Sequence, residues 1–549
     1  PQYEDISSSK IRRAIDLNMD ISKEMDPLAL RYIYKYGLYY NEPRYKSVIQ
    51  TKAIDLEIVK KIDDNIISTL INNFRKDIDI NALIQLKDKL EPTILIVKEA
   101  KEDNIIGFST FYCIKNYMLY DEFKDTNITN YLRDKLSGKI AFISGIYVKN
   151  NDNHPVEVVL NETLAQCLVS DCNHAIYCNK LTYKNKELIE KNIRIQGFIE
   201  TPFKSNTSSL FIVNMSNPIT LSLDLETLLK PPFDNSSAIK DVINKTREKL
   251  KDAISKLYPG ELVIVFNRDM IYSKLIQKIC DINQVPTVQD QNRVLGPNMC
   301  VPFGSTLNGR ILPNTVTKSL HSEKIFYPDI KGFTIGAFPN YLSLEHQAKT
   351  LSSFNRPIIL VDDLLHKGYR LNVIEPILRN CNIEIKKLVV GILTGRGKEL
   401  GAIKNIELDS AYFVPNLKLW FNENLQYPFI GGDAVFREEY NQDYLIPSIN
   451  LILPYVFPSF IKNSSIKAIY NLSEISLTNA IELFKAIEKL YQRINGRNLV
   501  IRNLGHVVIA PRKPDTLNSS EIIRNCKPSD YLMQNLEQLK RVENVLTRI

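Results

Sequence analysis

Short apolar runs alternate with amphipathic stretches in the second half of the chain. The runs at 358–361 and 388–393 consist mainly of Val, Ile and Leu, as buried strands of a parallel sheet do. The first run is followed by apolar residues at helical spacing over 371–378, and residues 259–286 show the same order of strand, polar turn and helix. Strands that alternate with helices predict an α/β fold with a parallel sheet.

The first half of the chain shows a different order of elements. We predict a hairpin at 92–119, strands at 139–149, 174–178 and 210–215, and helices at 156–169 and 185–193. Amphipathic helices are predicted at 238–257, at 476–495 and from residue 529 onward. The Pro- and Ser-containing stretch at 230–237 has the composition of a linker. The chain is therefore divided into units at 1–45, 46–232, 238–465 and 466–549.

Composition fits several folded units. A chain of 549 residues is long enough for three or four domains, since one core rarely grows beyond about 250–300 residues. The 70 Lys and Arg against 62 Asp and Glu give a net charge of +8, with no basic stripe, so we expect no nucleic acid partner. The longest apolar stretch, 449–461, is interrupted by two prolines, so we expect no membrane span, and no signal peptide is seen.

Eight scattered cysteines indicate a reducing compartment, and we expect a cytoplasmic protein. Four potential zinc ligands, Cys167, Cys172, His174 and Cys178, lie close in sequence. A helix end followed by a strand would point these side chains in different directions, so we do not expect a zinc site there.

The most informative stretch is 356–371, RPIILVDDLLHKGYRL. Its buried strand leads directly into Asp362 and Asp363 and then into a turn that contains Gly368. Ligands bind at the carboxyl ends of strands in open α/β sheets. Backbone amides at the start of a helix can hold a phosphate, and the two acids can accept hydrogen bonds from sugar hydroxyls. A phosphorylated ribose fits both features, with its phosphate at the amides and its sugar hydroxyls at the two acids. An Asp-Asp helix cap without a ligand is the alternative.

This stretch resembles the phosphoribosyl pyrophosphate (PRPP) loop of type I phosphoribosyltransferases. The resemblance implies Mg²⁺-dependent transfer of a phosphoribosyl group to a nitrogen nucleophile such as a nucleobase. Asp362 and Asp363 would hold the ribose diol and act on Mg²⁺ indirectly. The family usually places Thr or Ser in the turn, where this chain has His366, Lys367, Gly368, Tyr369 and Arg370. Lys367 and Arg370 would replace those hydroxyls as cationic phosphate ligands, which leaves open a site that binds without turnover.

Three flanking segments extend this resemblance. Residues 259–286 resemble the opening strand and helix of the same family, which makes Arg268 a candidate pyrophosphate ligand or a surface residue at a helix start. Arg396, in a Gly-containing turn after the 388–393 strand, is a second candidate. Residues 412–423 resemble a base-binding segment, in which Trp420 or Phe421 would stack on a nucleobase or belong to the core.

Residues 6–12, ISSSKIR, resemble the carboxyl end of the nicotinate-nucleotide adenylyltransferase branch of nucleotidylyltransferases. The resemblance implies that Ser8, Ser9 and Arg12 bind a triphosphate at a helix start; a chance capping helix is the alternative. The family's catalytic His motif lies far upstream of this segment, whereas the first histidine here is His154. We therefore expect residues 1–45 to be the tail of a catalytic region outside this chain, docked on that region or on the second unit.

The second unit resembles a GNAT acetyltransferase in its order of strands and helices and in the QGF turn at 196–198. The family holds the coenzyme A pyrophosphate with a Gly-rich turn after the fourth strand, where this chain has KNNDNHP at 149–155. We therefore expect a mixed GNAT-like sheet with splayed fourth and fifth strands that does not bind acetyl-CoA with ordinary affinity. Two alternatives to phosphoribosyl transfer stay open: a regulatory or scaffold module of a nucleotidylyltransferase, and an acetyltransferase with a nucleotide-sensing domain.

Overall fold

The computed structural model describes residues 7–17, 19–22, 24–36, 38, 48–49, 54–74, 78–99, 104–149, 153–180, 185–204, 208–288, 294–436, 446–504, 507–509 and 524–546. It is a multidomain α/β structure, as the sequence predicts, and the described residues form three sheets, of which the third is not expected from the sequence. In the parts of the chain that it describes, no helix has both the length and the apolarity needed to cross a bilayer.

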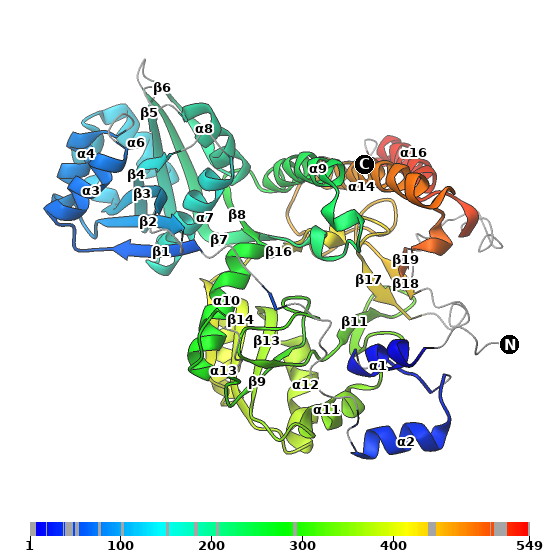
Figure 1. Ribbon diagram of the computed structural model, residues 1–549. Helices are drawn as coiled ribbons and strands as arrows, with labels where there is room; N and C mark the ends of the chain where they lie inside the picture. Colours follow the sequence, from blue (N-terminus) through cyan, green and yellow to red (C-terminus); the bar gives the residue numbers. More distant parts are fainter. Residues whose placement is uncertain are drawn as a thin grey trace.

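The first sheet lies in the amino-terminal half and has helices on both faces (Figure 1). Its strands follow the order β1-β2-β3-β4-β5-β7, and all neighbours are antiparallel except β4 and β5. The strands are β1 Ile54–Val59, β2 Thr93–Glu99, β3 Asn104–Lys115, β4 Lys139–Val148, β5 His174–Lys180, β6 Ile199–Lys204 and β7 Ser208–Leu223. The helices are α3 Asp64–Phe74, α4 Ile80–Gln85, α5 Leu119–Phe123, α6 Thr126–Lys135, α7 Asn153–Val169 and α8 Lys186–Ile195.

Strands β4 and β5 are paired over only part of their lengths. The pairing runs from Ile140 to Ile143, although β4 continues to Val148. A register shift against β3 leaves Ser144 without a directly opposite residue, which is a β-bulge. The parallel pair therefore diverges beyond the bulge, as the sequence predicts for the fourth and fifth strands.

Strand β7 is long enough to belong to two groups of strands. Its first half pairs with β5 and β6, and its second half lies between two parallel neighbours, β8 Glu261–Asn267 and β16 Leu419–Asn422. The strand at 261–267 was expected to open the parallel sheet of the next unit. It is instead part of the first sheet, because its register partner is β7.

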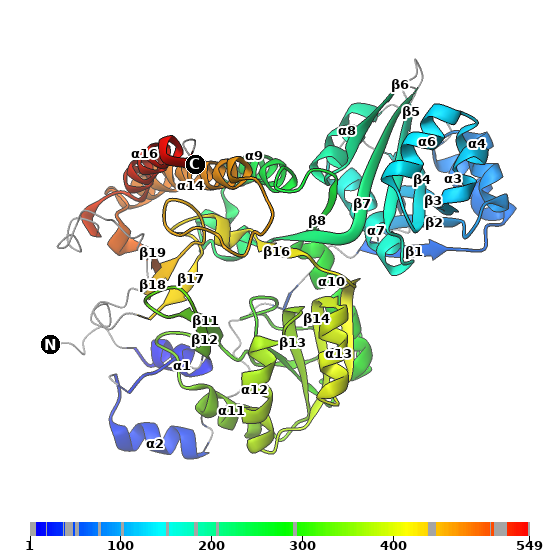
Figure 2. The same ribbon diagram turned by 180° about the vertical axis from the view of Figure 1, so that it is seen from behind.

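The second sheet is fully parallel, in the order β10-β9-β13-β14-β15. Its strands are β9 Met299–Pro302, β10 Val316–Thr317, β13 Ile358–Leu365, β14 Ile385–Thr394 and β15 Leu408–Val414. The helices around it are α10 Arg268–Asn283, α11 Leu344–Ser352, α12 Tyr369–Asn380 and α13 Gly395–Ile403 (Figure 2). Burial of the central strands on both faces explains their unbroken apolar runs.

A third, mixed sheet has the order β12-β11-β17-β18-β19. Its strands are β11 Ser322–Phe326, β12 Phe333–Ala337, β17 Asp433–Val435, β18 Ile446–Ile449 and β19 Val507–Ile509. Three long helices, α9 Ser237–Ser255, α14 Ile466–Asn495 and α16 Pro528–Leu546, pack together in the same part of the molecule (Figure 1). The helices predicted at 238–257, 476–495 and from 529 are therefore confirmed.

Helix α7 joins the first two sheets. Eleven of its 17 residues are buried, which matches a helix that is apolar on all sides. Glu162 on α7 accepts hydrogen bonds from Tyr412 of β15 at 2.5 Å and from Lys274 of α10 at 2.7 Å. One continuous hydrophobic core thus extends from the first sheet into the second.

The amino-terminal helices α1 Ser8–Asp16 and α2 Pro27–Tyr36 dock beside the second sheet, near α11 (Figure 2). Lys318 pairs with Asp16 in a buried contact, and the Asp20 N–H donates to the carbonyl of Asn340 at 3.0 Å. Phe354 packs on the small core of this segment. The expectation that the segment docks on the GNAT-like unit is wrong, because its apolar face and buried ion pair find their partners here.

Candidate functional site

The two adjacent acids lie at the carboxyl end of β13, in the middle of the second sheet. The strand continues through Asp362 and Asp363 to Leu365, and the chain enters α12 at Gly368. Asp362 is only 4% exposed, and the side chain of Asp363 is 11% exposed. We expected acids that are open to a ligand. In the structure both acids are enclosed, because other segments of the protein already form hydrogen bonds and ion pairs with them.

Asp363 already has a full set of hydrogen-bond donors. Its carboxylate accepts from the Ser305 N–H and hydroxyl, both at 3.0 Å, and from the Thr306 N–H. Arg370 Nη1 lies 3.5 Å from the same carboxylate. A carboxylate offers about four acceptor positions. A ribose diol therefore reaches Asp363 only if the loop at 304–306 moves.

Asp362 is held by Arg370 and by the chain itself. Its Oδ1 accepts from Arg370 Nη1 at 3.1 Å and from the Asp363 N–H at 2.9 Å. A Cβ atom at Gly304 would lie 2.3 Å from this Oδ1, so glycine is needed for the loop to approach the acids so closely. Burial raises the pKa of Asp362 to about 7, although the positive charge of Arg370 opposes that rise.

Arg370 connects the acids to the third sheet. Burial raises the pKa of Glu323, on β11, to about 7, and the nearby charge of Arg370 acts in the opposite direction. Asp433, on β17, is buried and pairs with Lys324 at 3.4 Å. Four carboxyl groups thus share two cationic side chains. Burial raises the pKa values of Asp362, Glu323 and Asp433, and the two cations offset only part of that rise.

The turn after the acids provides a positively charged edge. Gly368 has φ +67°, a left-handed conformation that favours glycine, and it begins α12 without a side chain that could cap the helix. The first amide groups of α12 are therefore left to solvent or to a ligand. Lys367 and Arg396 are exposed beside this turn. Together with burial, which is the larger effect, their charges lower the pKa of His366.

Helix α13 begins next to α12. Its N-cap, Thr394, accepts from the Gly397 N–H at 3.1 Å and is also bonded to His366 Nδ1 at 3.1 Å. A Cβ at Gly397 would lie 2.2 Å from the carbonyl oxygen of Leu365. This close packing brings the N-termini of α12 and α13 to one edge of the sheet, beside the exposed cations Lys367 and Arg396, an arrangement that favours an anion.

The remaining predicted ligands of this site lie in different places. Arg268 begins α10, and its guanidinium lies 5.9 Å from the ring centre of Tyr272. Burial raises the pKa of Tyr272, the negative charge of Asp363 raises it further, and the positive charge of Arg268 lowers it. Arg268 is therefore within electrostatic reach of the acid turn, although its strand belongs to the first sheet.

The two aromatic candidates belong to strand β16. Phe421 is 2% exposed and packs against Phe460, with ring centres 6.0 Å apart. Trp420 is half-buried and pairs with Thr220 of β7. The aromatic ring beside the acid turn is that of Tyr369, which is 51% exposed and packs edge-on against Phe333.

The candidate nucleotide ligands of the tail are exposed at the start of α1. Ser7 caps this helix, and Arg12 Nη2 donates to Ser8 Oγ at 3.2 Å. Ser8, Ser9 and Arg12 all face solvent, on a segment that lies near α11. They are not part of the acid turn.

The first sheet has its own polar centre, where α7 begins. Asn153 donates to Glu157 at 2.7 Å and accepts from Asn192 of α8 at 2.8 Å. Lys251 of α9, which is 4% exposed, pairs with Glu157 at 2.7 Å. Asn185 also donates to the carbonyl of Val148, the last residue of β4, at 3.3 Å. Parts of the 149–155 turn, residues 150–152, lie outside the described residues.

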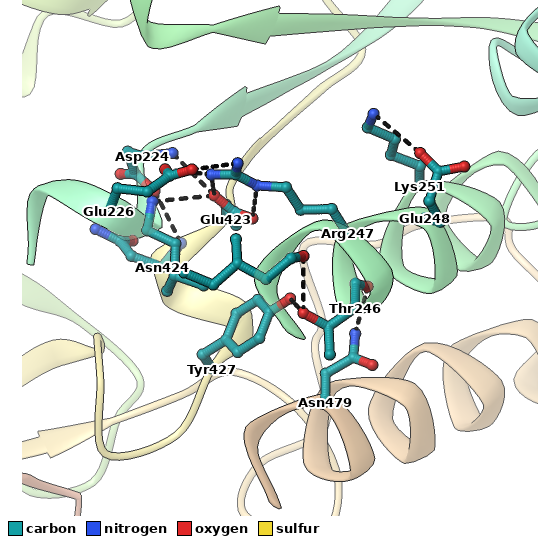
Figure 3. Close-up of polar contacts among 12 residues, drawn as sticks. Asp224, Glu226, Thr246, Arg247, Glu248, Lys251, Glu423, Asn424, Tyr427 and Asn479 are labelled. Carbon is teal, nitrogen blue, oxygen red and sulfur yellow. Dashed lines mark hydrogen bonds and ion pairs between the residues drawn. The ribbon is translucent and has the colours of Figure 1, made fainter. Parts of the chain in front are cut away.

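Sequence reasoning missed a buried charge cluster at the carboxyl ends of β7 and β16 (Figure 3). Arg247 Nε donates to Glu423 at 2.5 Å, and the guanidinium also binds Glu226. The backbone N–H groups of Asp224 and Leu225 both donate to Glu423 at 3.0 Å. These charges lie about 20 to 200 positions apart in sequence, so no local pattern reveals them.

This buried cluster and the acid turn influence each other. Burial and the negative charges of Glu423 and Asp363 raise the pKa of Asp224. The carboxyl edges of the first and second sheets therefore meet near Asp363, although no motif connects them.

In the described residues, the two acids are occupied by protein donors rather than arranged with further metal ligands. Among the described residues, no group of three His, Cys, Asp or Glu side chains has an arrangement that suits a metal ion. Asp363 has its acceptor positions occupied, and the guanidinium of Arg370 lies where a cation would bind Asp362.

Comparisons with known proteins reach only part of the chain. No family model matches, and no curated protein matches. A solved structure of FeeM, an N-acyl amino acid synthase from uncultured soil microbes, is 7% identical, with 29% of this chain and 90% of that chain covered and a TM-score of 0.24.

Two further solved structures are N-acetyltransferases. Campylobacter jejuni PseH, in complex with acetyl coenzyme A, is 16% identical, with 30% and 99% coverage and a TM-score of 0.20. A GNAT family acetyltransferase from Bacillus cereus is 17% identical, with 29% and 97% coverage and a TM-score of 0.19. We draw no functional conclusion from TM-scores this low. The strand order of the first unit, with its parallel pair β4 and β5, is the order that the sequence resemblance predicts.

Proposed function

We propose that this chain binds a phosphorylated ribose compound, PRPP or a relative of it, at the carboxyl edge of the second sheet. The phosphate would lie at the first amide groups of α12, between Lys367 and Arg396. The observation that carries the proposal is the left-handed Gly368, which starts a helix without a side-chain cap beside two exposed cations, Lys367 and Arg396. The sugar would extend toward Asp362 and Asp363.

We further propose that the chain acts as a binding module rather than as a transferase. In a phosphoribosyltransferase both acids would be open to the ribose diol. Here Asp363 is saturated by the 304–306 loop, and Asp362 is paired with Arg370. The enzyme that such a module would regulate is the nucleotidylyltransferase implied by residues 6–12. Mg²⁺ would enter only with the pyrophosphate of a ligand.

Calorimetry tests binding, and release of pyrophosphate from PRPP in the presence of nucleobases tests turnover. We expect saturable heat with PRPP and with ribose 5-phosphate, no heat with ribose alone, and no turnover. Paired substitution of the exposed side chains Lys367→Ala and Arg396→Ala should weaken binding at least tenfold without unfolding the protein, because neither belongs to the enclosed network of Asp362, Asp363 and Arg370. Absence of binding by folded wild-type protein would refute the proposal. Turnover would show that the chain is a transferase rather than a binding module.

Acyl transfer by the first unit is a second candidate. The observation in its favour is the divergence of β4 and β5 after Ser144, which opens a gap between two parallel strands. Against this candidate, the ion pair of Glu157 and Lys251 occupies the start of α7. Asn185 also donates a hydrogen bond to the carbonyl of Val148. Saturable binding of acetyl-CoA in the micromolar range would favour this candidate.

A further inference from the structure

Two cysteines from distant parts of the first unit are in contact. Cys113 lies near the end of β3, and Cys172 lies in the turn between α7 and β5. Their sulfur atoms are 4.0 Å apart, although 59 positions separate them in sequence. We propose that Cys113 and Cys172 are a redox-active dithiol, which an oxidant converts into a reversible disulfide.

The geometry requires only a small movement. A disulfide has an S–S distance of about 2.05 Å, so the two sulfur atoms must approach by roughly 2 Å. Cys113 lies on β3, which is held by regular pairing with β4, whereas Cys172 lies in a turn. Rotation of the Cys172 side chain, with adjustment of its turn, is therefore the expected route to closure.

The surroundings activate one thiol more than the other. Cys113 Sγ lies 3.5 Å from Glu91 Oε2, and Lys139 Nζ is 2.6 Å from the same oxygen. Contact with the Cys172 thiol, together with the charge of Lys139, lowers the pKa of Cys113. Contact with Cys113, together with burial, raises the pKa of Cys172. A low-pKa thiol beside a second thiol is the arrangement of an attacking and a resolving cysteine.

Access is controlled by a surface ion pair. Cys113 and Cys172 are 1% and 4% exposed, whereas the side chains of Glu91 and Lys139 are 55% and 29% exposed. A small oxidant such as hydrogen peroxide would reach Cys113 when this pair opens. A bulky reagent would not.

The chemistry balances with peroxide as the oxidant. The Cys113 thiolate attacks one peroxide oxygen, the O–O bond breaks, and a sulfenic acid and hydroxide form. The Cys172 sulfur then attacks the Cys113 sulfur, the S–O bond breaks, and water leaves as the disulfide forms. Each disulfide consumes one peroxide, which is reduced to two waters.

The neighbouring Cys167 provides a matched control. It is as buried as the pair, and burial raises its pKa well above the ordinary value of a thiol. In the whole chain described here, hydrogen peroxide should lower the intact mass by two hydrogen atoms for each disulfide formed. Peptide mapping should join the segments that contain Cys113 and Cys172, and dithiothreitol should reverse the change. C167S should behave like the wild type.

The C113S and C172S variants separate the two roles. C172S should stop at a sulfenic acid on Cys113, seen as a mass gain of one oxygen atom on the peptide that contains it, whereas C113S should give neither sulfenic acid nor disulfide. The oxidised wild type should melt a few degrees higher than the reduced protein, because the disulfide constrains the unfolded chain. A mapped link between other cysteines would overturn the proposal, as would unchanged thiols at Cys113 and Cys172 after oxidation of a folded protein.

Discussion

At the scale of single residues, Gly368 is the position where the addition of a single Cβ atom should disturb the candidate site most. Its φ is +67°, and a Cβ there would lie 2.1 Å from Leu400 Cδ2. Gly368→Ala should therefore cost more than the roughly 1 kcal/mol of a left-handed alanine, and it should weaken binding of ribose 5-phosphate. Gly496 is the control, with φ +64° and no atom within 4 Å of its Cβ position.

Thermal melting and calorimetry of the two alanine variants test this point. G496A should lower the melting temperature slightly and leave ligand affinity unchanged. G368A should lower the melting temperature further and should also lower the ligand affinity. Equal effects of the two substitutions would contradict the tight packing of the turn against α13.

The enclosed acids give a second prediction at this scale. The folded protein holds protons on Asp362 and Glu323 up to about pH 7, whereas these groups ionise near their ordinary values in the unfolded chain. The folded state therefore binds more protons between about pH 4 and about pH 7, and stability falls as the pH rises through that window. Asp362→Asn should flatten this fall by up to about 4 kcal/mol.

Thermal melting across that pH range measures the effect. Asn at position 362 mimics the protonated acid, so the variant should lose less stability than the wild type between about pH 4 and about pH 7. A variant whose melting temperature keeps the full pH dependence would show that Asp362 does not hold a proton.

At the scale of elements, the start of α7 is blocked by an interhelical contact. Lys251 of α9 is buried against Glu157 of α7 at 2.7 Å and has a longer contact with Glu248, at 3.6 Å. Glu157→Gln should destabilise the protein by about 2 kcal/mol, because the buried ammonium then keeps only the longer ion pair. The Asp252–Lys256 pair on the same helix is exposed, and Asp252→Asn should cost less than about 0.5 kcal/mol.

The melting temperatures of the two variants provide the comparison. A loss in E157Q no larger than that in D252N would mean that this contact does not hold α7 to α9. In either variant, and in the wild type, we expect no saturable acetyl-CoA binding in the micromolar range.

The sequence predicts the type of most elements, and it does so where local pattern and burial agree. The runs at 358–361 and 388–393 are central strands as expected, because a strand covered on both faces must be apolar throughout. The sequence does not place β8, since its apolar run is equally suited to either sheet. Pairing with β7 is decided by tertiary packing alone.

The same limit applies to the site. Adjacency in the chain identified Asp362, Asp363 and Gly368. The donors that saturate Asp363 come from residues about 60 positions away, and Glu323 is contributed by another sheet. Candidate binding residues from a single stretch can therefore be proposed from the sequence, whereas the contacts that restrain them cannot.

At the scale of the whole molecule, the shared core predicts coupled unfolding of the first two sheets. Glu162, 5% exposed, links α7 to both Lys274 and Tyr412. Scanning calorimetry should show these sheets melting in one transition in the wild type. Glu162→Ala should separate that transition into two or lower it by several degrees. Two independent transitions in the wild type would contradict a continuous core.

The central claim is that a phosphorylated ribose binds beside Gly368, and His366 reports on it directly. The charges of Lys367 and Arg396 help to lower the pKa of His366. A phosphate dianion bound between them would offset those charges and raise that pKa.

The decisive measurement is an NMR pH titration of ¹³C-labelled histidines with and without ribose 5-phosphate, in which His366→Gln identifies the resonance. We predict that the ligand raises the pKa of His366 and leaves His174, in the first sheet, unchanged. Ligand saturation of the folded protein with no change at His366 would contradict the account, as would the complete absence of binding.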